Sequence, residues 1–241
     1  LARRVEGARA GVVPTPILLV MLGLVEVDLD VVAIDADAAR VAIGDTVAVV
    51  AGGEDGRLRH SIAATDDDDV GATTFGALNW TAGTDLYMCA RFFISDITDN
   101  KFFVGFGDTI ATSDETTFSA TTDTVTIDTM SDAIGILFDN AATTKVLWCV
   151  AGKTDAVTVN KSLNAKYNPV AAEAMTLGVH LGADRKSAQF YVNGVLVHTV
   201  SSTSTIIAAV DLVPGVWNYG QGTAYTFDLD LLYATKARAT T

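Results

Sequence analysis

Three acidic residues alternate with apolar ones near the start of the chain, at Glu26, Asp28 and Asp30. Alternate side chains of a strand point to one face, so these carboxylates would lie side by side, and retaining glycoside cleavage uses such a pair. The same alternation recurs at Asp228 and Asp230, and aromatic residues that could stack a sugar are missing around Glu26. We therefore predict a strand with one solvated face and no catalytic residue.

A second set of candidates lies in residues 175–200, whose pattern predicts three consecutive antiparallel strands. The last two are joined by Asn193-Gly194, which is typical of a type I′ turn because both central residues of that turn need positive φ. A two-residue turn sets the register of its hairpin. The predicted cross-strand pairs are Val192 with Val195, Tyr191 with Leu196, Phe190 with Val197, and Gln189 with His198.

This register would place His180, Gln189, Tyr191 and His198 together on the outer face of one sheet. Two imidazoles on either side of an amide are suited to binding a sugar hydroxyl or a metal ion. No carboxylate joins them from these strands. A solvated or partner-facing sheet surface is therefore the alternative interpretation.

Trp217 and Tyr219 form a third candidate, because they follow the turn residues Pro214-Gly215 and could present a surface platform for stacking a sugar. Trp148, in contrast, alternates with valines in its own segment. That pattern predicts a core position for Trp148.

Two acidic segments offer the hard oxygen ligands that calcium prefers, Asp66–Asp69 and the group Asp96, Asp99 and Asn100. Neither has the Asp-x-Asp-x-Asp-Gly spacing of a calcium loop. We therefore predict solvated acidic loops and no cofactor, with calcium binding as the alternative. Four adjacent like charges also disfavour a strand, so Asp66–Asp69 is predicted to be a loop.

The composition narrows the range of partners. The chain has 241 residues and a formal net charge of −13, and a field of that sign opposes nucleic acid and anionic membranes. Hydrophobic residues make up 49% of the chain, yet no run reaches the ~18 apolar residues of a membrane helix. Cys89 and Cys149 lie inside apolar, strand-like runs and are predicted to be buried free thiols.

The elements that must position these residues are almost all strands. Short alternating segments separated by turn residues at intervals of ~8–12 residues are typical of an all-β sandwich, and a weak helical pattern occurs at residues 168–175. We predict one two-sheet antiparallel sandwich over residues 26–241, preceded by an extended arm over residues 1–25. The clearest strand signals are Glu26–Ile34, Ala39–Val50, Leu86–Ile94, Lys101–Gly107, Ala133–Asp139, Lys145–Val150, Met175–Leu181, Ser187–Val192 and Tyr225–Ala234.

The order of these segments resembles the concanavalin A-like jelly roll of laminin G domains, legume lectins and laminarinase-type glycoside hydrolases. The resemblance covers residues 80–235 and rests on LYMCARFFISD, KFFVGFGD, AIGILFDN, LGVHLGADRKSAQFYVNGVLVHTV and FDLDLLYA. It implies the fold, whereas function depends on the site that a particular chain places on that fold. Within this superfamily, the acidic, Cys-poor and Ala/Val/Thr-rich composition is most similar to capsid decoration (cement) proteins of tailed phages.

The arm over residues 1–25 has an apolar middle, and Pro14 and Pro16 favour an extended approach to it. Exposed to water, such a segment would be an aggregation liability, so we expect it to lie across a neighbouring subunit. The alternative is an ordinary first strand in the core of the chain itself. The residues expected to drive assembly are Ile17, Leu18, Leu19, Met21 and Leu22.

Two classes of function follow from these patterns. The first is a structural virion protein on the outer capsid surface, which would bind the major capsid protein and copies of itself as a homo-oligomer and stabilise the shell. The alternative is a carbohydrate-binding module or lectin, secreted or at a cell surface, that binds a glycan through its loops or its outer sheet face.

Overall fold

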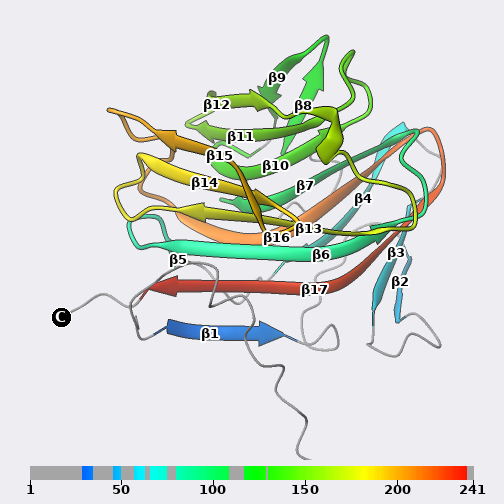
Figure 1. Cartoon of the computed structure of the whole chain (residues 1–241), viewed down its shortest axis with the longest axis horizontal. Helices are drawn as coiled ribbons and strands as arrows, with labels where there is room; N and C mark the ends of the chain where they lie inside the picture. The colour runs from blue at the N-terminus through cyan, green and yellow to red at the C-terminus, as the bar shows by residue number, and fades with distance from the viewer. Residues whose placement is uncertain are drawn as a thin grey trace, which may run out of the picture.

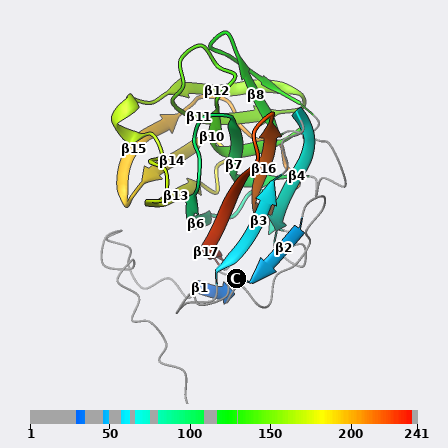
Figure 2. The same cartoon turned by 90° about the vertical axis from the view of Figure 1, so that its right-hand side faces the viewer.

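The chain folds into two antiparallel sheets packed face to face, as predicted. A computed structural model describes residues 29–34, 46–49, 57–62, 66–74, 80–108, 117–128 and 130–237. Figure 2 shows the sheets as two layers, with β6 and β17 in one and β7 and β16 in the other. The predicted arm over residues 1–25 lies outside the described residues.

The first layer is an eight-stranded sheet in which β1 (Leu29–Ile34) pairs with β17, as Figure 1 shows. The other strands follow in this spatial order: β15 (Val195–Ser201), β14 (Ser187–Val192), β13 (Ala174–Leu181), β6 (Leu86–Ile94), β17 (Tyr225–Ala237), β3 (Leu58–Ile62) and β2 (Thr46–Val49). Strand β14 alternates between buried and partly exposed residues, which is the pattern of a sheet with one face toward water.

The second layer is a seven-stranded sheet in which the short β5 (Trp80–Thr81) pairs with β16. Its other strands are β12 (Ala156–Ser162), β11 (Leu147–Lys153), β10 (Ala133–Asp139), β7 (Asn100–Gly107), β16 (Asp211–Gln221) and β4 (Asp66–Thr74). Every residue of β7 and β10 is buried, which means that both faces of this sheet are covered at its centre. A separate hairpin consists of β8 (Phe118–Thr121) and β9 (Thr124–Ile127).

Phenylalanine side chains form much of the core between the two sheets. The ring of Phe92 on β6 stacks on that of Phe227 on β17, with centroids 4.5 Å apart, and lies 5.3 Å from the ring of Phe102 on β7. These contacts join the two layers, since Phe102 belongs to the opposite sheet. Cys89 and Cys149 are buried free thiols, as predicted.

The hairpin of β14 and β15 agrees with prediction near its turn and differs beyond it. Asn193 and Gly194 have φ of 49° and 76°, as a type I′ turn requires, and the Tyr191–Leu196 pair is present. Beyond that pair the register shifts, so that Phe190 pairs with His198.

The predicted pairs of Phe190 with Val197 and of Gln189 with His198 are therefore wrong. A β-bulge inserts one unpaired residue into a strand, and here β15 gains it at Val197. The two-residue turn controls only the pairs beside it. After the bulge, Gln189 lies opposite Thr199.

Two further local predictions are wrong. Asp66–Asp69 begins strand β4 rather than forming a loop, with Asp66 paired to Gln221 and Val70 to Tyr219. Strand β4 lies at the edge of its sheet, and charged residues are common on such edge strands.

Residues 168–175 form no helix; a short 3₁₀ helix, Ala165–Tyr167, precedes them and leads toward β13. Among the described residues, no helix has the length and apolar character needed to cross a membrane.

Candidate ligand-binding surface

The β8–β9 hairpin covers the outer face of the seven-stranded sheet, on the side away from the other sheet (Figures 1 and 2). Phe118 and Ala120 of the hairpin pack into a second apolar cluster with Phe103 and Trp217 of the sheet. Gly152 permits this close approach, because a Cβ atom there would overlap the side chain of Ile127. This face of the sandwich is therefore a second core rather than a binding surface.

Trp217 and Tyr219, predicted to form a surface platform, both lie beneath this hairpin with 0% exposure. The Tyr219 hydroxyl accepts a hydrogen bond from the Thr117 backbone N–H at 3.1 Å, which ties the sheet to the start of the hairpin. That prediction is wrong, because the turn residues before Trp217 carry no information about a distant hairpin folding over it. Trp148 is buried in the same cluster, as predicted.

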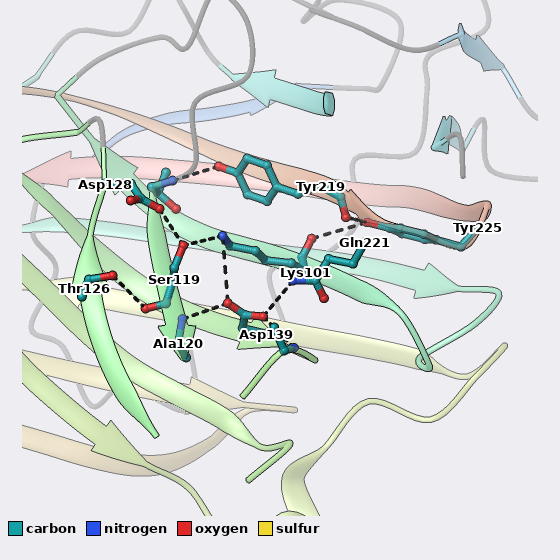
Figure 3. A network of polar contacts seen from close by, with 11 residues as sticks. Lys101, Ser119, Ala120, Thr126, Asp128, Asp139, Tyr219, Gln221 and Tyr225 are labelled. Atoms are coloured by element: carbon teal, nitrogen blue, oxygen red, sulfur yellow. Dashed lines mark hydrogen bonds and ion pairs between the residues drawn. The ribbon is translucent and has the colours of Figure 1, made fainter. Parts of the chain in front are cut away.

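A buried ion pair holds the hairpin in place (Figure 3). The Lys101 ammonium donates to Ser119 Oγ at 2.7 Å and lies 3.9 Å from Asp139 Oδ2. Asp139 Oδ2 also accepts from the Ala120 backbone N–H at 2.8 Å, and Ser119 Oγ donates to Asp128 at 2.6 Å. Lys101 and Asp139 are only 2% and 1% exposed. The ion pair is structural, since both of its members are buried, while Asp128 at the edge of the network is exposed.

The outer face of the eight-stranded sheet carries a different group of residues. In register across β14, β13, β6 and β17, one row contains Gln189, His180 and Tyr87, and the next contains Tyr191 and Tyr233. All five side chains are partly exposed. We call this group the tyrosine patch. The structure thus brings together His180, Gln189 and Tyr191, as predicted, and adds two tyrosines that sequence reasoning missed.

Tyr87 contacts each of the other two tyrosines edge to face. The Tyr87 ring centroid lies 6.4 Å from that of Tyr191 and 6.2 Å from that of Tyr233. Gly178 forms part of the floor, because a Cβ atom there would lie 3.3 Å from the Tyr87 hydroxyl. Cys89 is the neighbouring floor residue, and burial raises the pKa of its thiol to about 11. The floor is therefore neutral and unreactive near pH 7.

The polar groups of the patch are suited to hydrogen bonding with hydroxyl groups. The Tyr191 hydroxyl donates to Gln189 Oε1 at 2.6 Å, which leaves the Gln189 amide nitrogen without a partner among the described residues. His180 Nε2 lies 3.6 Å from Asp85 Oδ1. Burial raises the pKa of Tyr191 and of Tyr233, so both phenols stay protonated near neutral pH. The patch combines ring faces with donors and an imidazole.

His198 does not belong to the tyrosine patch. Its ring stacks on that of Phe190, with centroids 6.0 Å apart, and the two residues form a cross-strand pair. Directly opposed residues share a face, and Phe190 points into the core. The pKa of His198 is lowered by burial and by the charge of Lys161. The bulge in β15 is the reason that this predicted site residue lies elsewhere.

The remaining candidates show no assembled site. Asp96 caps its own loop by accepting from the Thr98 backbone N–H at 2.7 Å, and Asp99 accepts from Asn140 and from Thr223. Within the described ranges, no cluster of three or more His, Cys, Asp or Glu residues is arranged to hold a metal. Asp30 lies in β1 opposite Lys236. The predicted residues Glu26, Asp28, Ile17, Leu18, Leu19, Met21 and Leu22 lie outside the described residues.

Comparisons with known proteins define the fold class. A protein of unknown function from Shewanella oneidensis MR-1 aligns over 83% of this chain and 80% of its own, with a TM-score of 0.55 at 13% identity. Peanut lectin, solved with a 9mer peptide, aligns over 89% of this chain and 100% of its own, with a TM-score of 0.55 at 15% identity. The chain thus has the concanavalin A-like sandwich fold of lectins.

A third similar structure is that of botulinum neurotoxin type C, which depends on interaction with two ganglioside molecules to enter cells. The alignment covers 83% of this chain and 44% of the toxin chain, with a TM-score of 0.50 at 10% identity. No family model matches the sequence, and no curated protein matches it. At these identities the likenesses describe the fold alone.

Proposed function

We propose that this protein is a non-catalytic carbohydrate-binding protein that binds a glycan on the tyrosine patch. The observation that carries the proposal is the gathering of Tyr87, Tyr191 and Tyr233, all partly exposed, above Gly178 and Cys89 on one sheet face. Aromatic rings supply apolar area at low entropic cost, and each tyrosine keeps a polar group for a hydroxyl. Gln189 and His180 lie in the adjoining row and would orient the sugar.

The fold relatives support this choice over the alternatives. Two proteins of similar fold are a lectin, from peanut, and a neurotoxin whose entry into cells depends on two ganglioside molecules. The capsid decoration role predicted from composition has no support from these comparisons, and the arm on which it depends is outside the described residues. Binding to a virion, and self-association, therefore remain predictions.

The non-catalytic part of the proposal draws support from the two acids of β17 beside the arginines of this sheet face. Asp228 Oδ1 lies 2.6 Å from Arg59 Nε, and Asp230 Oδ2 lies 3.2 Å from Arg91 Nε. Both carboxylates are thus held by arginines within the protein. We expect a bound glycan to dissociate without being cleaved.

A titration of the purified protein against a panel of soluble oligosaccharides tests the proposal. Replacing Tyr191 or Tyr233 with Ala should weaken binding about tenfold or more, which corresponds to ~1.4 kcal/mol, because a stacking ring is lost. Tyr191→Phe keeps the ring and should cost less than Tyr191→Ala. Tyr167, a partly exposed tyrosine outside the patch, supplies the matched control Tyr167→Ala.

Two outcomes would contradict the proposal. One is the absence of binding to any member of the panel at millimolar concentration. The other is glycan binding that Tyr191→Ala and Tyr233→Ala leave unchanged, since a glycan would then bind elsewhere. Release of shortened products during prolonged incubation would contradict the non-catalytic part alone.

A further inference from the structure

A group of arginines adjoins the tyrosine patch on the same sheet face. The outward residues of β6 run Tyr87, Cys89, Arg91 and Phe93, and successive outward residues on a strand are about 6.8 Å apart. Arg91 therefore follows directly after the floor of the patch. Arg57, the residue directly before β3, also contacts this part of the face, with its guanidinium carbon 3.8 Å from the Phe93 ring centroid.

The two carboxylates beside these arginines differ in how they are paired. Asp228 accepts hydrogen bonds from Nε and from a terminal nitrogen of Arg59, at 2.6 and 2.7 Å, so this bidentate pair is complete. Asp230 is shared: its oxygens lie 3.2 Å from Arg91 Nε and 3.9 Å from Arg57 Nε. Arg57 and Arg91 thus each approach Asp230 most closely through Nε, and no hydrogen bond joins their terminal nitrogens to another described residue.

The two arginines are more exposed to solvent than the aspartate that they share. The side chains of Arg57 and Arg91 are 33% and 50% exposed, whereas that of Asp230 is 10% exposed. The negative group thus lies underneath, and the donors of the guanidinium groups reach solvent. The three arginines outnumber the two aspartates, so the group carries one net positive charge in a chain of net charge −13. Stacking on Phe93 limits the motion of the Arg57 guanidinium group.

From this geometry we infer that the glycan is acidic: a sugar carboxylate binds the terminal nitrogens of Arg57 and Arg91 while neighbouring rings lie on the tyrosine patch. The inference rests on the proposed function. Guanidinium groups match carboxylates in shape and bind them in a bidentate manner, which an ammonium group does not. The charge of −13 disfavours long polyanions, so the ligand is a short segment with few carboxylates.

Matched pairs of ligands test the inference. Tetragalacturonic acid and its methyl ester differ in their carboxylates, and 3′-sialyllactose and lactose differ in the sialic acid; each is titrated by calorimetry at neutral pH. We expect at least one acidic ligand to bind tenfold or more tightly than its neutral counterpart. Arg91→Met and Arg57→Met should each reduce that preference to threefold or less. Arg91→Lys should retain more of the preference than Arg91→Met but less than the native protein, because lysine keeps the charge and loses the planar guanidinium group.

Arg185→Met is the matched control, since it removes one positive charge from the loop between β13 and β14, outside the arginine group. It should leave the preference unchanged. Equal binding of acidic and neutral ligands, still lost in Tyr191→Ala, would overturn this inference and leave the proposed function standing. A preference for acidic ligands that persists in Arg57→Met and Arg91→Met would overturn it as well. If no glycan binds at all, the proposed function fails with it.

Discussion

At the scale of single residues, His60 shows how a polar group inside the sandwich makes stability depend on pH. It is buried in β3, with Nδ1 3.5 Å from the Asn218 amide nitrogen and its ring edge-on to Phe227. Burial lowers the pKa of His60 to about 4, and the nearby charge of Asp228 opposes the shift only in part. The folded protein therefore holds His60 neutral at pH values where the unfolded chain protonates it.

The sign of the resulting pH dependence follows from that difference. The ordinary pKa of histidine is about 6.5, so the unfolded chain binds more protons than the folded protein between pH 6.5 and 4. We expect His60 to cost nothing above pH 6.5 and roughly 3 kcal/mol of unfolding free energy by pH 4. Urea denaturation of the native protein and of His60→Gln across this range measures the effect. If the unfolding free energy falls by the same amount in both proteins between pH 6.5 and 4, His60 is not the cause of the pH dependence.

The tyrosine patch and the arginine group also belong to the residue scale. Both use residues whose neighbours are in place before a ligand arrives, with Gly178 beneath Tyr87 and Phe93 beneath Arg57. Preorganised side chains lose less entropy on binding. For this reason we expect single substitutions to change affinity without changing the fold.

At the scale of elements, the β8–β9 hairpin decides which face of the sandwich is closed. It is joined to the seven-stranded sheet by the Lys101–Asp139 pair and by apolar contacts of Phe118. A hairpin of two short strands is marginal by itself, so its position depends on these contacts with the sheet. The closed face in turn buries Trp217 and Tyr219.

Removing the buried cation should loosen this hairpin. Lys101→Met leaves the Asp139 carboxylate buried without its counter-charge, and breaking such a pair costs about 3–5 kcal/mol. We expect this loss in urea denaturation, together with faster hydrogen–deuterium exchange at the Ala120 amide, which bonds to Asp139. The double variant Lys101→Met/Asp139→Asn removes both charges and should recover part of the stability. A loss below about 1 kcal/mol for the single variant would show that the pair is dispensable.

At the scale of the whole molecule, one core joins both sheets. The Phe92 ring contacts Phe227 in its own sheet and Phe102 in the other. Phe92→Ala should therefore destabilise both layers together, by about 3–5 kcal/mol, the usual range for truncating a core phenylalanine. Circular dichroism and tryptophan fluorescence should report the same transition midpoint, because Trp217 lies in the second sheet. Separate midpoints would show that the sheets unfold independently.

Much of the architecture was predictable because its signals are local. Alternation in SAQFYV identified β14 and its inner and outer faces, and Asn193-Gly194 identified the turn and the first pairs beside it. Those short-range rules also placed His180 opposite Gln189 on the outer face. The strands KFFVGFG and AIGILFD lack polar alternation. That pattern was the available sign that the seven-stranded sheet is covered on both faces.

The candidate site was decided mainly by tertiary structure. Tyr87 and Tyr233 join Tyr191 because β6 and β17 pair beside β13, and such neighbours come from segments far apart in the chain. A single bulge removes His198 from the outer face, and a distant hairpin buries Trp217. Alternation and turn chemistry act over a few residues and determine the strands and their faces. Which strands become neighbours, and which face is covered, depends on packing between distant segments, which only the folded structure shows.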